Sequence, residues 1–136
     1  MDANRAREFL RTHHHAILST FRADGRPQLS PVAATIDAQG RVIISTRETA
    51  MKVHNVRRDP RVALAAFTDR FFGEWVQVEG TAEIVSLPDA LELLVDYYRR
   101  SAGEHSDWDE YRAAMLEQKR VVLRFSIERA GPNVSG

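Results

Sequence analysis

Cations and hydroxyl groups gather at the junction between an apolar segment and a short basic one. Residues 41–45 favour a strand, residues 46–49 a turn and residues 50–58 a helix that ends at Asp59-Pro60. A helix N-terminus presents unpaired backbone N–H groups and a partial positive charge. The hydroxyl and cationic side chains around this one belong to Ser45, Thr46, Thr49, Arg47 and Lys52. Together these groups predict a binding site for a phosphate.

The same residues also have plainer interpretations. Lys52 and Asn55 are three residues apart, so they share one face of the predicted helix, and such a face is usually a solvated polar one. By pattern alone, Trp75 at the start of a later strand indicates a core or interface residue rather than the wall of a ligand site.

Three arginines follow in the basic segment, Arg57, Arg58 and Arg61. They could grip a polyanionic chain, or they could pair with Asp59 or Glu48 at the surface, where ion pairs contribute only about 0–1 kcal/mol. Nucleic-acid binding is a weaker alternative, because 19 Lys and Arg residues balance 19 Asp and Glu residues and leave no net charge. We therefore expect no nucleic-acid partner.

The elements that would position these groups are mostly strands. Alternating apolar residues indicate six of them, at residues 15–21, 28–36, 41–45, 61–67, 74–85 and 121–127. A helix is predicted at residues 3–11, and two more lie behind capping-box patterns, Ser86-Leu-Pro-Asp89 and Ser106-Asp-Trp-Asp109. Short meander connections then predict a mainly β fold, a six-stranded antiparallel barrel with peripheral helices. A barrel of six strands is filled by its own side chains. We therefore expect a sizeable ligand to bind outside the barrel, where two barrels meet.

Length and composition limit the class of protein. A chain of 136 residues favours a single domain over residues 1–136, with a flexible tail at 130–136. The absence of cysteine excludes disulfides, thiolate catalysis and cysteine-ligated metal centres. The run His13-His14-His15 has no carboxylate nearby, so we expect no metal site. An N-terminus without an apolar signal core, and no run of membrane-spanning length, predict a cytoplasmic protein with no membrane partner.

Five segments in this order carry a family resemblance: residues 23–32, 44–46, 52–61, 75–80 and 102–112. They resemble the split β-barrel flavin-binding family related to pyridoxamine 5′-phosphate oxidase. They are similar to the actinobacterial branch that uses the deazaflavin coenzyme F420 in place of FMN. The resemblance implies an oxidoreductase that transfers a hydride from reduced F420 to an unsaturated small-molecule substrate. It also implies a homodimer with two equivalent cofactor sites at the interface.

The resemblance further implies roles for particular residues. Lys52 and Asn55 would hold the cofactor phosphate, and the strand end would add further contacts. The cofactor-binding residues implied in this way are Ser30, Pro31, Val32, Ser45, Thr46, Arg47, Met51, Lys52, Asn55, Trp75 and Gln77. Relatives often carry an arginine where this chain has Ala50, so Arg47 is the candidate to supply that charge. No catalytic side chain is implied, because the cofactor carries the chemistry.

Two alternatives stay open. The first keeps the fold and binds FMN, as a flavoprotein similar to pyridoxamine-phosphate oxidase. The second is a carrier of flavin or haem with no enzymatic activity.

Overall fold

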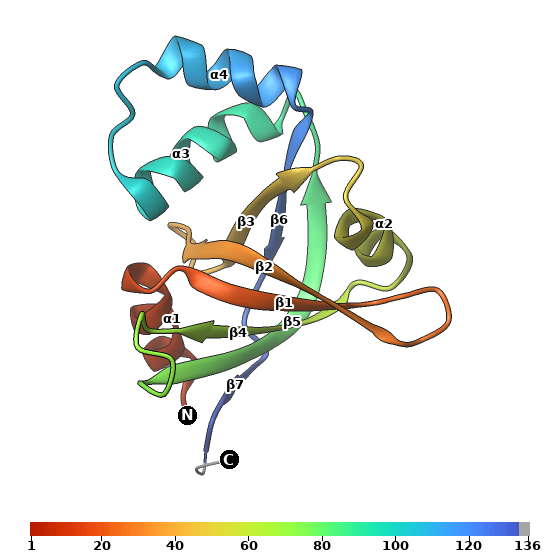
Figure 1. Ribbon diagram of the computed structural model, residues 1–136, viewed down its shortest axis with the longest axis vertical. Helices are drawn as coiled ribbons and strands as arrows, with labels where there is room; N and C mark the ends of the chain where they lie inside the picture. Colours follow the sequence, from red (N-terminus) through yellow and green to blue (C-terminus); the bar gives the residue numbers. More distant parts are fainter. Residues whose placement is uncertain (134–136) are drawn as a thin grey trace.

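A closed barrel of antiparallel strands forms the centre of the computed structural model, which describes residues 1–133 (Figure 1). Its strands are β1 (His15–Phe21), β2 (Pro27–Ile36), β3 (Val42–Arg47), β4 (Arg61–Phe67), β5 (Trp75–Val85) and β6 (Arg120–Phe125). Neighbours follow the order β4-β1-β2-β3-β6-β5, and pairing of β4 with β5 closes the ring. The predicted mainly β fold with a six-stranded antiparallel barrel is confirmed.

The hairpin between β1 and β2 sets which side chains face the core. The two strands pair along their full length, from His15 opposite Ala33 to Phe21 opposite Pro27. The turn needs a left-handed residue, which Gly25 provides with φ 87°. The Asp24 carboxylate accepts hydrogen bonds from the Arg26 backbone and guanidinium, and these bonds lower the pKa of Asp24. The register fixed by this turn places alternate β1 residues inside the barrel and the others on its outer face.

Strand β5 pairs with a different neighbour along each half of its length. Its first half pairs with β4, and its second half, from Ala82 onward, pairs with β6. Gly80 lies at the changeover, where a Cβ would clash with the backbone oxygen of Ser126 and stand 2.7 Å from Phe125 Cδ2. Only glycine lets β5 pass this close to the end of β6.

Apolar side chains on the inner faces of the strands fill the barrel. The large, fully buried ones are Leu18, Ile36, Ile44, Leu64, Val78, Leu123 and Phe125. Each side chain of this kind stabilises the fold by about 1.5–3 kcal/mol through burial. The interior is therefore a packed core with no room for a cofactor, and ligand sites must lie on its outside.

Helices cover the outside of the barrel (Figure 1). α1 (Ala3–Thr12) begins at Asp2, whose carboxylate accepts from two backbone N–H groups, and it packs Phe9 and Leu10 on the core. α3 (Ala90–Ala102) and α4 (Trp108–Glu117) pack over β3 and β6 in a second apolar cluster. No helix among residues 1–133 combines the length and apolarity needed to cross a bilayer.

Both predicted capping boxes differ from the observed helix starts. α3 has no side-chain cap, because Ser86 Oγ instead donates to Glu48 and accepts from Arg57. α4 is capped by Asp107, whose carboxylate accepts from the Glu110 backbone at 3.1 Å. The serine–aspartate patterns therefore predicted where each helix starts, but they did not identify the residue that caps it.

The C-terminal segment includes a strand that the sequence pattern does not predict. A tail is expected from residue 130, whereas β7 (Arg129–Gly131) pairs with residues 77–79 of β5. A three-residue strand has too few positions to show a period of two. Residues 134–136, the rest of the expected tail, lie outside the described part of the chain.

The buried side-chain amide of Asn55 holds α2 (Met51–Arg58) against one end of the barrel. Asn55 Nδ2 donates to Thr20 Oγ1 at 3.1 Å, and Asn55 Oδ1 accepts from Arg58 at 3.0 Å. Asn55 and Thr20 are both 1% exposed, so water cannot replace these bonds. The amide therefore fixes the position of α2 relative to β1.

We predict that Gly80→Ala lowers the free energy of unfolding by about 1–3 kcal/mol, because the added methyl group overpacks the junction of β5 and β6. Urea unfolding followed by circular dichroism measures this change. Gly131→Ala is the control, since its Cβ would meet its nearest neighbour, the Asn133 backbone nitrogen, at an ordinary 3.7 Å. Equal stabilities of the two variants would contradict the proposed close approach.

We predict that Asn55→Ala lowers the free energy of unfolding by about 1–3 kcal/mol, because it removes the buried hydrogen bond to Thr20 Oγ1 and the bond that Asn55 Oδ1 accepts from Arg58. His54→Ala on the exposed side of the same helix should change it by less than about 0.5 kcal/mol. Thermal and urea unfolding of both variants give the comparison. A free energy of unfolding of Asn55→Ala equal to that of the parent protein would show that the amide does not hold α2 in place.

Candidate functional site

β2 and β3 separate halfway along their length and leave a split in the barrel wall. They pair only from Ala34 opposite Ile44 to Ile36 opposite Val42. Beyond that point the first half of β2 pairs only with β1, while β3 continues along β6 as far as Arg47. α2 follows this strand end after a short turn (Figure 1). In that turn the Ala50 N–H donates to the Arg47 carbonyl at 3.0 Å. The split is therefore bordered by the strand and helix residues expected from the sequence.

Three cations meet at the end of β3. Arg47 lies directly opposite Arg120, the first residue of β6. Half-buried Lys52 has its pKa lowered by burial and, secondly, by the positive charge of Arg120. Within residues 1–133, none of these three cations forms an ion pair with a carboxylate, whereas Arg57 and Arg124 both do.

Polar atoms without a partner within residues 1–133 lie at the start of α2 and on β2. Ala50 is the N-cap of α2 and has no side chain able to satisfy the backbone N–H groups of the first turn. Ser30 Oγ, on the part of β2 that has left β3, is buried and has no hydrogen-bond partner within the described chain. Backbone donors, a free hydroxyl group and unpaired cations together suit a phosphate.

The other residues expected at the junction differ in exposure. Ser45 is half-buried, Thr46 is buried, and Arg47 and Met51 are exposed. Asn55 shares the helix with Lys52, but its amide is already bonded within the protein. The roles of these residues toward a cofactor stay predictions.

Tyr97 is a residue at the split that sequence reasoning missed. It comes from α3, and its hydroxyl group donates to the Ala33 carbonyl of β2 at 2.8 Å. Burial raises the pKa of Tyr97, and the nearby Ser45 backbone and Arg120 partly oppose this rise. Sequence patterns within the helix could not show that Tyr97 reaches β2, which lies 64 residues away in the chain.

Trp75 and Gln77 lie on a different part of the surface. The strand register places Pro31, Ile17, Ala65 and Gln77 in one row across the outer face of β2, β1, β4 and β5. Three strand spacings of about 4.8 Å put Gln77 about 14 Å from β2. Within one chain, Gln77 therefore lies three strands away from Pro31.

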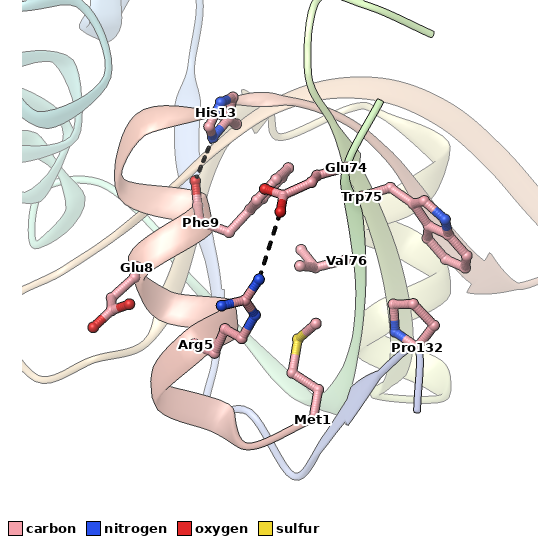
Figure 2. A pocket seen from close by; sticks show the side chains of 9 residues that line it. All are labelled: Met1, Arg5, Glu8, Phe9, His13, Glu74, Trp75, Val76 and Pro132. Carbon is pink, nitrogen blue, oxygen red and sulfur yellow. Dashed lines mark hydrogen bonds and ion pairs between the residues drawn. The ribbon is translucent and has the colours of Figure 1, made fainter. Parts of the chain in front are cut away.

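Trp75 instead borders a hollow of about 470 Å³ between α1 and β5 (Figure 2). Its walls are formed largely by Met1, Phe9, Val76 and Pro132, and Trp75 lies beside Pro132 in Figure 2. Arg5 on its rim pairs with Glu74 at 3.5 Å. This hollow is a poor site for an anion, because Arg5 is already paired and the carboxylates of Glu74 and Glu8 lie next to it.

The three arginines that could have gripped an anionic chain all bond within the protein. Arg57 pairs with Glu48 at 2.5 Å, and Arg58 donates to the Phe21 carbonyl at 2.7 Å. Arg61 pairs with Asp59 at 2.6 Å and lowers the pKa of Asp59 to about 2. The surface-pair interpretation of these residues is the one that the structure supports.

The three consecutive histidines turn in different directions. His13 follows α1 and stacks on Phe9, and His14 Nδ1 lies 2.9 Å from the Ala34 carbonyl. His15 begins β1 and lies 3.7 Å from Asp69. Among residues 1–133, no three His, Asp or Glu side chains are grouped so that they could hold a metal ion.

Comparisons with known proteins agree with this architecture. The family model for pyridoxamine 5′-phosphate oxidase matches residues 3–132. An F420H2-dependent biliverdin reductase from Mycobacterium tuberculosis (strain CDC 1551 / Oshkosh) is 30% identical over 123 residues, 89% of this chain and 80% of that protein.

Solved structures show the same fold. A conserved hypothetical protein from Mycobacterium tuberculosis superposes with a TM-score of 0.77 at 26% identity, covering 100% of this chain and 92% of the other. A structure described as an F420 reductase has a TM-score of 0.71 at 20% identity, covering 91% and 94%. The chain therefore belongs to the pyridoxamine 5′-phosphate oxidase family of split-barrel proteins, in the branch that includes F420-dependent reductases.

Proposed function

We propose that this protein is an oxidoreductase that uses reduced coenzyme F420 to transfer a hydride to an unsaturated small molecule. The observation that carries the proposal is a group of cations beside the uncapped start of α2 that form no ion pair within residues 1–133, with Lys52 half-buried among them. A phosphate bound there would offset both the burial cost and the mutual repulsion of these charges. The biliverdin reductase relative, named as F420H2-dependent, supports the choice of cofactor.

The residues at the split fit such a cofactor. Lys52 and the backbone N–H groups of the first turn of α2 would hold its phosphate, and Ser30 Oγ is a buried hydroxyl group with no hydrogen-bond partner among residues 1–133. When bound, F420 supplies the hydride, and the protein contributes position and shielding from water. The strand residues Pro31 and Val32 would lie along the ring and keep solvent from it.

Lys52→Ala should weaken F420 binding by about 1.5–3 kcal/mol, because it removes a charge-assisted contact to the phosphate. Fluorescence titration measures the affinity, and His54→Ala on the same helix is the matched control. An unchanged affinity in Lys52→Ala would place the phosphate elsewhere.

The same preparation distinguishes the alternatives. F420 should bind more tightly than FMN. If the purified protein is yellow and releases FMN on heating, FMN rather than F420 is the cofactor. Stopped-flow mixing of bound reduced F420 with a panel of unsaturated acceptors should show its oxidation. Binding of F420 without oxidation by any acceptor would instead support a carrier.

We also propose that two copies pair through the outer face of β2, β1, β4 and β5. Small and apolar residues dominate this face, with Ile17, Ala33, Ala65 and Phe67 around a hollow of about 530 Å³ and its neighbouring surface. Exposed Phe71, 74% accessible, continues it at the end of β4. Apolar surface of this extent favours a protein partner. A second copy would bring its own Trp75 and Gln77 across the interface toward the split.

Ala65→Arg at the centre of this face should convert a dimer into a monomer, because a buried guanidinium would lack a partner across the interface. Analytical ultracentrifugation gives the oligomeric state. Ala113→Arg on exposed α4 adds the same charge away from the face and should leave the dimer intact. A monomeric parent protein, or a dimer that persists in Ala65→Arg, would contradict the assignment.

A further inference from the structure

Arg47 is the residue expected from the sequence to add the second cation of the phosphate site, but another arginine is better placed. Arg47 is exposed at the end of β3, and within the described chain no side-chain hydrogen bond orders it. Arg120 is half-buried on the neighbouring strand, where its Nε donates to Gln118 Oε1 at 2.9 Å. That bond orients the guanidinium and leaves its two terminal nitrogens available for a ligand.

The backbone before Arg120 supports its position. Lys119 has φ 52°, a left-handed conformation that is costly for a residue with a side chain. Its carbonyl accepts a hydrogen bond from the Glu48 N–H at 2.9 Å, so the start of β6 is tied to the turn after β3. This connection holds Arg120 beside the strand end that leads into α2.

The charges around Arg120 are uncompensated. Arg47 lies directly opposite it, and like charges in that position destabilise a pair of strands. The positive charge of Arg120 also lowers the pKa of Lys52. The nearby carboxylate of Glu48 is occupied by Arg57 at 2.5 Å. These cations thus repel one another, and a bound anion would offset that repulsion.

We propose that Arg120 is a phosphate-binding residue, which together with Lys52 and the start of α2 completes the site for a phosphate ester. The proposal deepens the cofactor site above and rests on it for the identity of the ester. Guanidinium groups bind two phosphate oxygens at once, which suits both a monoester and a diester. Arg120 supplies a cation close to α2, where Ala50 has none.

The test compares Arg120→Gln with Arg124→Gln, which lies on the same strand but pairs with Glu83 at 2.6 Å. Inorganic pyrophosphate, titrated by calorimetry, should bind Arg120→Gln about tenfold or more weakly than it binds the parent protein. Arg124→Gln should match the parent. Melting temperatures of both variants confirm that each is folded.

A second measurement needs no ligand. In the free protein, the pKa of Lys52 measured by NMR should rise in Arg120→Gln, because a neighbouring positive charge is gone, and stay unchanged in Arg124→Gln. An unchanged Lys52 pKa together with unchanged pyrophosphate affinity in Arg120→Gln would overturn the proposal.

The outcome also separates this inference from the proposed function. If pyrophosphate binding depends on Arg120 but neither F420 nor FMN binds, the phosphate site stands and the cofactor assignment fails. If F420 binding depends on Lys52 but is equal in Arg120→Gln and Arg124→Gln, the cofactor assignment stands and the role of Arg120 is wrong.

Discussion

The short pairing between β2 and β3 is the constraint on which the candidate site depends. Three residue pairs join these strands, and beyond them each strand keeps only one of its neighbours. A closed barrel has no free strand edges, so this separation is the place where backbone and side-chain groups of the wall become available. The end of β3, the start of α2 and the phenol of Tyr97 all meet there. Closure elsewhere, through β4 and β5, keeps the barrel stable in spite of the gap.

The site holds its charges at the expense of stability. Half-buried Lys52 and the opposed arginines repel one another, and the seat of α2 on Thr20 prevents the helix from moving away. A ligand that binds only the folded state raises the free energy of unfolding, by about 2.7 kcal/mol at a concentration of 100 times its dissociation constant. Repulsion in the free protein and affinity for an anion are thus two effects of one arrangement.

The sequence predicted the barrel well because the signals involved are local. Alternation along β5 and the glycine turn after β1 determine strand and hairpin from neighbouring residues alone. The basic start of α2 is equally local, and it makes Lys52 a candidate for the phosphate site. Arg120 and Tyr97 were missed because their places follow from the pairing of β6 with β3 and the packing of α3 on β2. The resemblance implied Asn55 at the phosphate, and helix spacing alone indicated a solvated polar face. Neither could show that its amide is buried against Thr20.

The two helices α3 and α4 leave the barrel after Val85 and return before Val122, and these two residues are paired neighbours on adjacent strands. An excursion whose ends lie side by side can change in length or sequence without altering the barrel. Yet Tyr97 reaches from this excursion to the split. Changes in this one segment would therefore alter the surroundings of the split while the strands beside it stay as they are.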